Sequence, residues 1–304
     1  MAVRDVYRLL DGALVGTMLA DEPLSRHTTL KVGGPAALFI RCAAMEDLRL
    51  VIEACRRCEV PWTVIGRGSN LVASDSGYPG VVIELEGDFK AYGFAPDGTL
   101  TAGAGTQLAL LVQEAFNRCL AGLEPAVGIP GTLGGAIVMD AGSRRQWIGS
   151  SVLEVKVYDP DAGLRRISGS DIEWGYRRCS LPAGVVVVSA VLGLTPANQA
   201  MLRGTMEGSL ARRRKSQPLN MPSAGSTFKN PEGANVAELI EGCGLKGLAV
   251  GGAQVSTRHA NFIVNTGGAT AADVIQLALT VRERVREVHG IELQPEVRFL
   301  GFSR

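Results

Sequence analysis

The first residues of the chain place apolar side chains at helical spacing. Val3, Val6, Tyr7, Leu10 and Leu14 follow an i, i+3, i+4, i+7 pattern, with polar residues between them. This spacing puts the apolar side chains on one face of a helix. We therefore predict a short amphipathic helix within residues 1–24. Because the segment lacks the pattern of a secretory signal, we expect it in the mature protein.

Apolar runs then alternate with a helical pattern. Residues 36–41 and 61–65 have the composition of strands, and residues 45–59 between them have a helical stripe. This order predicts a β-α-β unit. Residues 81–85 add a further strand.

Two turn signals predict hairpins in the middle of the chain. The segment 95–99 reads Ala-Pro-Asp-Gly-Thr, and 159–163 reads Asp-Pro-Asp-Ala-Gly. Pro, Asp and Gly in these positions favour tight turns between strands. The other elements expected here are a helix at 107–120 and strands at 152–158, 164–168 and 185–194.

Composition changes near residue 198, where we place a domain boundary. A helix is expected from 198 to about 214, followed by a helix at 236–241 and a strand at 261–264. A long helix should begin at Thr270-Ala-Ala-Asp273, which resembles a capping box, and end at Gly290. The pattern as a whole predicts an α+β protein with mixed sheets in at least two domains.

Length and charge restrict the class of protein. The chain has 304 residues, 46% hydrophobic and 20% charged, with a net charge of +1. This length allows two or three cores, and the near-zero charge argues against nucleic-acid binding. The longest apolar run, 185–194, is broken by Ser189 and is shorter than the roughly 20 residues of a membrane helix, so we expect no membrane insertion.

Six cysteines are spread along the chain, which predicts reduced thiols in a cytoplasmic protein. Cys55-Arg-Arg-Cys58 has the spacing of a redox or zinc motif, but it lies late in a predicted helix and has no second pair. The three histidines, at 27, 259 and 289, are widely separated. We therefore expect no metal site.

Two glycine clusters have the character of anion-binding loops. One is Gly66-Arg-Gly-Ser-Asn70, directly after a predicted strand, and the other is Gly128-Ile-Pro-Gly-Thr-Leu-Gly-Gly-Ala136. Glycines allow successive backbone N–H groups to converge on a phosphate, although each cluster alone could be a tight turn. Two clusters in one domain favour a dinucleotide. A third glycine pattern, 242–247, follows a helix and is interpreted as a helix end.

The segment from Asn220 to Pro231 gathers chemically active side chains. Gly225 allows close approach of the backbone, Ser226 carries an exchangeable proton, and Lys229 and Asn230 are donors. A surface loop rich in turn-forming residues is the alternative interpretation.

Taken in order, these motifs resemble the UDP-N-acetylenolpyruvoylglucosamine reductase (MurB) family over nearly the full length. The matching segments are Thr28-Thr-Leu-Lys-Val-Gly-Gly34, Ile65–Leu71, Gly128–Gly135, Trp174-Gly-Tyr-Arg177, Ala224–Pro231 and Leu293-Gln-Pro-Glu-Val-Arg298. The resemblance implies an FAD-binding domain of the vanillyl-alcohol-oxidase (PCMH) type, made of two α/β subdomains, followed by an α+β substrate domain. We place these domains at 25–198, with subdomains at about 25–88 and 89–198, and at 199–304.

The resemblance also implies a reaction. NADPH would reduce FAD, and hydride from FAD would reduce UDP-N-acetylglucosamine enolpyruvate to UDP-N-acetylmuramate, in peptidoglycan precursor synthesis. The family's catalytic residues fall on Arg177, Ser226 and Glu296. A guanidinium suits stabilisation of an enolate, and a serine hydroxyl suits its protonation. A bare carboxylate would repel the enolate, so Glu296 is expected to be protonated or to share a proton.

Binding residues follow from the same motifs. Expected FAD contacts are Gly66, Arg67, Gly68, Ser69, Asn70, Gly128, Ile129, Pro130, Gly131, Gly134 and Gly135, and expected substrate contacts are Tyr176, Lys215, Lys229, Asn230, His259 and Asn261. Arg177 could instead be a surface cation, Glu296 a solvated carboxylate, and the basic run 212–215 a solvated helix end.

Three departures from the family pattern are visible. No tyrosine follows Arg177, so the chain resembles the subclass without a tyrosine-bearing lid. Asp140 replaces a usual asparagine and Cys179 a usual serine; the pair Arg144-Arg145 could offset the charge of Asp140. A monomer is expected. The rival interpretations are an FAD-dependent oxidase or dehydrogenase of the same fold with another substrate, and a non-catalytic protein on this scaffold.

Overall fold

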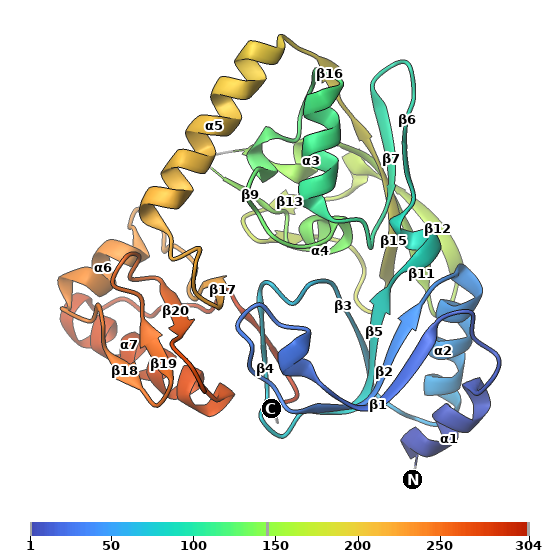
Figure 1. Ribbon diagram of the computed structural model, residues 1–304, viewed down its shortest axis with the longest axis horizontal. Coiled ribbons are helices and arrows are strands. Elements are labelled where there is room, and N and C mark those ends of the chain that lie inside the picture. The colour runs from blue at the N-terminus through green and yellow to red at the C-terminus, as the bar shows by residue number, and fades with distance from the viewer. Residues whose placement is uncertain (1, 144–145, 303–304) are drawn as a thin grey trace. The chain divides into compact units, whose positions relative to one another are not determined.

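The computed structural model describes residues 2–143 and 146–302. The chain packs as two compact units. Figure 1 shows the chain coloured by residue number. Unit 1 consists of the segment ending at Ala20 together with Leu38–Gly66 and Gly80–Ala211. Unit 2 consists of Asp21–Ala37, Arg67–Pro79 and the segment that begins at Arg212.

A four-stranded sheet opens unit 1. Its order is β1 (Thr17–Pro23), β2 (Pro35–Cys42), β5 (Tyr78–Leu85) and β3 (Trp62–Ile65), and β3 runs parallel to β5. Helix α2 (Met45–Arg57) joins β2 to β3 and buries the stripe formed by Leu48, Val51, Ile52 and Cys55. The predicted β-α-β unit is therefore confirmed.

The N-terminal helix α1 (Ala2–Leu10) packs against α2. Val6 and Leu10 are buried on its inner face, as the apolar spacing predicts, and Tyr7 is exposed. The helix stops before Leu14, which is half-buried in the following segment.

A five-stranded antiparallel sheet follows in unit 1. Its order is β12 (Gly163–Ser168), β11 (Val152–Asp159), β15 (Val186–Gly193), β7 (Thr99–Gly103) and β6 (Tyr92–Phe94). Both predicted hairpins are present, because β6 pairs with β7 and β11 with β12. The remaining α-helices and strands of unit 1 are α3 (Leu108–Asn117), β8 (Leu120–Ala121), α4 (Leu133–Val138), β9 (Gly142–Ser143), β10 (Gln146–Trp147), β13 (Trp174–Gly175), β14 (Arg178–Cys179) and β16 (Thr195–Pro196).

Helix α5 (Gln199–Ser216) leads into unit 2, which contains a four-stranded antiparallel sheet. The strand order is β17 (Ser223–Ser226), β20 (Phe262–Asn265), β19 (Ala253–Val255) and β18 (Ala249–Val250). Helix α7 (Ala271–His289) contacts β18 and β19, and α6 (Val236–Gly242) contacts α7.

Sequence signals set both ends of α7. The Thr270 hydroxyl accepts a hydrogen bond from Asp273 N, and the Asp273 carboxylate accepts one from Thr270 N. This capping box satisfies N–H groups that have no partner inside the helix. The helix ends at Gly290, whose φ of 69° lies in the left-handed region that glycine tolerates. The predicted helix is confirmed at both ends.

Segments 21–37 and 67–79 pack with the C-terminal part of the chain. Strand β4 (Leu71–Ala73) pairs in parallel with β21 (Arg298–Leu300), so cyan and red ribbons run side by side in Figure 1. The carboxylate of Asp75 accepts hydrogen bonds from Ala271 N and Ala272 N at the start of α7. Sequence patterns did not predict β4 or β21, and the predicted domain bounds, 1–24, 25–198 and 199–304, stay a prediction.

Three further features concern thiol chemistry, metal binding and membrane insertion. All six cysteines are free, and burial raises the pKa of the Cys55 thiol to about 12, which disfavours the reactive thiolate. No group of three or more potential metal ligands occurs among residues 2–143 and 146–302. Within the same residues, every helix is too short or too polar to cross a bilayer.

Candidate active site

Gly66, the first residue of one glycine cluster, adjoins the other cluster in unit 1. A Cβ at Gly66, the residue after β3, would lie 2.5 Å from the Thr132 hydroxyl. The same hydroxyl caps α4 by accepting a hydrogen bond of 3.5 Å from Gly135 N. Gly134 is also confined, because a Cβ there would lie 2.9 Å from the Ala104 methyl. Glycine at 66 and 134 therefore keeps the backbone close-packed around the first turn of α4.

The loop before α4 bends at two further glycines. Gly128 has a φ of 72° and Gly131 a φ of 136°, conformations that side chains rarely adopt. Ile129 and Pro130 lie between them, half-buried and exposed respectively. The N–H groups of Leu133 and Gly134 are bonded to Thr106 O and Ala104 O, so the first turn of α4 is fixed by the neighbouring chain. The four glycines between 128 and 135 lack side chains, which allows the diphosphate of a dinucleotide to approach this backbone closely. The residues of this structure thus fit FAD.

Residues 67–70 of the first cluster belong to unit 2. Gly68 has a φ of 57°, and a Cβ there would lie 2.1 Å from the carbonyl oxygen of His27. Asn70 makes hydrogen bonds through its side chain and its backbone. The side-chain Nδ2 donates to Glu296 O at 3.0 Å, and the backbone carbonyl accepts from Arg298 N at 2.9 Å. Arg67 is exposed and Ser69 is half-buried. The predicted FAD loop is therefore tied directly to the segment that carries Glu296.

Ser226 ends strand β17 in unit 2. It lies opposite Phe262 of β20, and the pairing of these strands is irregular between Ser223 and Ser226. Gly225 before it has a φ of 79° with no crowding, since the nearest atom to a Cβ there is Ser69 O at 3.9 Å. The backbone conformation is the reason for glycine at this position. Ser226, still paired with Phe262, is half-buried.

Glu296 lies on the segment that runs beside Ser226. Its backbone N donates to Thr227 O at 2.8 Å, Lys229 N donates to Gln294 O at 2.8 Å, and Phe228 forms an isolated bridge with Pro295. The Glu296 residue is only 9% exposed. Two predicted catalytic residues far apart in sequence thus belong to neighbouring segments of unit 2.

Arg177 and Tyr176 form the turn between β13 and β14 in unit 1. Arg177 has a φ of 60°, a region that non-glycine residues seldom occupy. Its guanidinium carbon lies 5.1 Å from the centre of the Tyr176 ring, within the range of a cation–π contact. Strained backbone at a charged, half-buried residue is a feature of functional sites.

Asp140 is a buried carboxylate of unit 1, only 1% exposed. Its Oδ1 accepts a hydrogen bond of 3.0 Å from Gly149 N. Burial raises the pKa of Asp140, and the hydrogen bond and the positive charge of Arg177 oppose that rise. Helix α4, which precedes Asp140, packs against β14, where the Cys179 thiol faces Val138 O at 3.6 Å. Arg144 and Arg145, the predicted counter-charges, lie outside the described residues.

The predicted substrate-binding residues of unit 2 have varied surroundings. Lys215 is exposed near the end of α5, and Lys229 is half-buried. Asn230 is exposed, and its Oδ1 accepts a hydrogen bond from Val236 N at 3.0 Å, which helps to start α6. The His259 ring packs against the Phe262 ring at a tilt, with centroids 4.8 Å apart, and its Nδ1 accepts a hydrogen bond of 3.3 Å from Asn261 N. Burial, with the charge of Lys246, lowers the pKa of His259 and so favours the neutral ring.

Asn261 differs from these residues because it is 4% exposed. Its Oδ1 accepts from Phe228 N at 3.0 Å, and its Nδ2 donates to Phe228 O at 2.8 Å. An amide buried in this way is directed at the backbone, so the predicted contact of Asn261 with substrate gains no support from this geometry.

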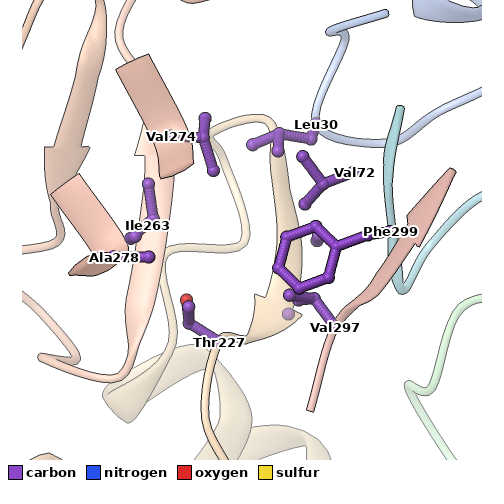
Figure 2. Close-up of a pocket in the computed structure, with 10 residues that line it drawn as sticks. Leu30, Val72, Thr227, Ile263, Val274, Ala278, Val297 and Phe299 are labelled. Carbon is purple, nitrogen blue, oxygen red and sulfur yellow. The ribbon is translucent and has the colours of Figure 1, made fainter. Parts of the chain in front are cut away.

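A small apolar cavity lies on one side of the Ser226 segment (Figure 2). Gly225 and Thr227 line it, together with apolar side chains that include Val72, Ile263 and Val274. Its volume of about 10 Å³ is the space of roughly one water molecule. The cavity is far too small for a sugar nucleotide, and it shows that packing behind the segment is incomplete.

Sequence patterns missed two hydroxyl residues of the site. The Thr29 hydroxyl donates to Ser223 O at 2.7 Å, and its backbone N donates to Gly68 O at 3.3 Å. Thr132 caps α4 beside Gly66. A threonine directly before a helix is a local signal for a cap. The role of Thr29 had no such signal, because its partners are distant in sequence.

Two parts of the chain match known families. Residues 36–168 match the FAD binding domain, and residues 217–300 match the C-terminal domain of UDP-N-acetylenolpyruvoylglucosamine reductase. With the paired sheets and the glycine loops of unit 1, these matches define an FAD-dependent oxidoreductase.

Full-length relatives identify the family. The chain is 48% identical over 290 residues to the UDP-N-acetylenolpyruvoylglucosamine reductase of Heliobacterium modesticaldum, covering 95% of this chain and 92% of that protein. It is 41% identical over 305 residues to the enzyme of Geotalea uraniireducens, covering 98% of each. The crystal structure of the Thermus caldophilus reductase (MurB) superimposes with a TM-score of 0.80 at 38% identity, covering 94% of this chain and 98% of that one. The chain belongs to the UDP-N-acetylenolpyruvoylglucosamine reductase family.

Proposed function

We propose that this enzyme reduces UDP-N-acetylglucosamine enolpyruvate to UDP-N-acetylmuramate, with NADPH as the reductant. The names and near full-length coverage of its relatives support the substrate class. The observation that carries the proposal is the pairing in unit 2, where the Glu296 segment is hydrogen-bonded to the residue after Ser226. It brings a hydroxyl and a buried carboxyl group onto adjacent backbone segments.

The proposed chemistry divides between the cofactor and the chain. FAD, when bound, supplies the hydride that adds to the enolpyruvyl double bond. Arg177 stabilises the negative charge that develops on the enolpyruvyl carboxylate and its α-carbon. Ser226 donates the proton to that carbon, and Glu296, carrying or sharing a proton, donates a hydrogen bond to the charged oxygen.

Binding roles follow the surroundings of each residue. The glycine loop at 128–135 and the cluster Gly66–Asn70 contact FAD, because their glycines allow its diphosphate to approach the backbone closely. Lys215, Lys229 and Asn230 hold the diphosphate of the sugar nucleotide, because cations and amide donors suit phosphate oxygens. Tyr176 and neutral His259 are further substrate contacts.

The location and the assembly of the enzyme belong to the same proposal. The six free cysteines support a reducing, cytoplasmic compartment. The proposed reaction requires no second copy of the chain, and we propose that the enzyme is a monomer.

Anaerobic stopped-flow absorbance at the flavin band tests the function. NADPH should bleach the flavin of the purified protein, and added UDP-N-acetylglucosamine enolpyruvate should restore it. Bleaching by NADPH followed by recovery with oxygen alone would contradict the proposed substrate. Failure of NADPH to bleach bound flavin would contradict the proposed reductant.

Glu296→Gln tests the hydrogen-bonding role of the glutamate. A glutamine of the same size still donates a hydrogen bond, whereas Glu296→Ala removes the donor. Single-turnover substrate reduction should be retained better in Glu296→Gln than in Glu296→Ala. Equal loss in the two variants would contradict a hydrogen bond from Glu296 to the substrate.

A further inference from the structure

One buried residue, Asn261, makes three hydrogen bonds to the Ser226 segment. Its side-chain amide pairs with both the N–H and the C=O of Phe228, and its backbone carbonyl accepts a hydrogen bond of 2.8 Å from Thr227 N. All three contacts fall on the two residues that follow Ser226. Since Asn261 is 4% exposed, water does not compete freely for these hydrogen bonds.

The segment is also bonded to the Glu296 segment through Thr227 O and Lys229 N, but three features restrain it only weakly near Ser226 itself. Gly225, before Ser226, has the backbone freedom of glycine. The cavity of about 10 Å³ against Gly225 and Thr227 leaves room behind the chain (Figure 2). Strand pairing is also irregular there, because the register between β17 and β20 shifts between Ser223 and Ser226. Side-chain packing and the sheet ladder therefore do not fix Ser226 by themselves.

We propose that Asn261 is a positioning residue that sets the location of the Ser226 hydroxyl. The proposal rests on the proposed function, in which Ser226 donates the proton. Through Thr227, the same clamp fixes the backbone that accepts the hydrogen bond from Glu296 N. Asn261 thus holds the proton donor in register with the glutamate, without touching substrate or cofactor.

Asn265 provides a matched control on the same strand. It is also buried, at 8% exposed, and its amide makes three hydrogen bonds: Nδ2 donates to Leu30 O, and Oδ1 accepts from Gly267 N and Ala269 N. None of these partners adjoins Ser226 in sequence. Asn265→Ala therefore removes a comparable buried amide and leaves the Ser226 clamp in place.

The experiment compares Asn261→Ala with Asn265→Ala, both loaded with FAD. The unfolding temperature should fall in both variants. Bleaching of the flavin by NADPH should match that of the parent enzyme in both. Recovery of flavin absorbance on anaerobic addition of UDP-N-acetylglucosamine enolpyruvate should slow at least about tenfold in Asn261→Ala and less than about twofold in Asn265→Ala, because misplacement of about 1 Å can cost on the order of a hundredfold.

Equal slowing in the two variants would overturn the positioning role and leave Asn261 a structural residue. If Ser226→Ala itself does not slow the recovery, the proposed function fails instead. Asn261→Asp serves if Asn261→Ala does not fold: it keeps the acceptor for Phe228 N and loses the donor to Phe228 O. It should slow the recovery with flavin bleaching retained, and parent-like recovery would refute the clamp.

Hydrogen exchange of the unmodified protein gives an independent measurement. The amides of Thr227 and Phe228 both donate to Asn261, so both should exchange slowly in the folded protein. Rapid exchange at both amides would contradict the clamp, whatever the variants do.

Discussion

The backbone N–H of Glu296 donates a hydrogen bond of 2.8 Å to the carbonyl oxygen of Thr227. This bond joins the C-terminal segment to the residue after Ser226. The Asn70 side chain in turn donates to the carbonyl of Glu296, so the glycine loop after β3 and the two candidate catalytic residues share one hydrogen-bonded network. A change in the backbone position of one of these segments should therefore shift the others.

Ser226→Ala should slow the step that consumes the sugar nucleotide. Loss of a positioned proton donor costs roughly 10²- to 10⁴-fold in rate. Flavin content and bleaching by NADPH should be retained, because the residue is not expected to bind FAD. Ser223→Ala, a hydroxyl loss on the same strand, is the control and should behave like the parent enzyme. Parent-like recovery of the flavin in Ser226→Ala would remove this serine from the mechanism.

Gly66→Ala should weaken FAD binding. The added methyl would lie 2.5 Å from the Thr132 hydroxyl and push it from its cap on α4. Overpacking costs about 1–3 kcal/mol, which corresponds to roughly 5- to 150-fold weaker binding if the cost falls on the FAD-bound form. The ratio of flavin to protein absorbance after dialysis measures it.

Gly93→Ala is the matched control for this prediction. Gly93 lies on β6 in the same unit, and a Cβ there would meet no atom within 4 Å. It should keep the flavin content of the parent protein. Equal flavin loss in both variants would mean that the close approach of Gly66 to Thr132 does not shape the site.

Asp140→Asn should stabilise the protein near neutral pH. Burial raises the pKa of Asp140 in the folded state, so its contribution is most favourable below the ordinary value of 3.8 and is lost as the pH rises through the raised pKa. Asparagine keeps an acceptor for Gly149 N without the buried charge. The gain in thermal stability should therefore shrink as the pH falls toward that value.

Asp97→Asn should show the opposite sign. The hydrogen bond from Thr99 N holds the pKa of Asp97 below its usual range, so the charged form stabilises the fold above the ordinary pKa. This variant should be less stable than the parent at neutral pH, with the difference closing on acidification. A difference independent of pH in either variant would contradict the assigned surroundings.

Asp75→Ala should lower the free energy of unfolding by about 1 kcal/mol, which is also the usual cost of losing a side chain that accepts hydrogen bonds from the first turn of a helix. Its carboxylate accepts hydrogen bonds of 2.7 Å from Ala271 N and 2.9 Å from Ala272 N, and its charge lies at the N-terminus of α7. Asp75→Asn keeps an acceptor and should lose less. Urea unfolding measures both, and Asp11→Ala, an exposed carboxylate elsewhere, controls for charge. If Asp11→Ala is equally destabilising, the cap is not the cause.

Local sequence determined most of the individual elements. The stripe Val274, Leu277, Val281 and Val285, with Thr270 and Gly290 at its ends, is sufficient to predict α7. The turn signals at 95–99 and 159–163 were likewise sufficient for two hairpins, because the partners of a hairpin are close in sequence. The order of the glycine and Ser226 motifs also carried the family resemblance.

The tertiary structure alone decided which distant segments meet. Strands β4 and β21 are three residues each, and their sequences contain no pattern that identifies the partner strand. They pair because the surrounding chain brings them together. Asn261 shows the same limit. The sequence motif suggested a substrate contact, but in the structure the residue is buried and its amide is hydrogen-bonded to Phe228. Residue types specify local conformation and available hydrogen bonds, whereas the choice among possible distant partners depends on the packing of the whole unit.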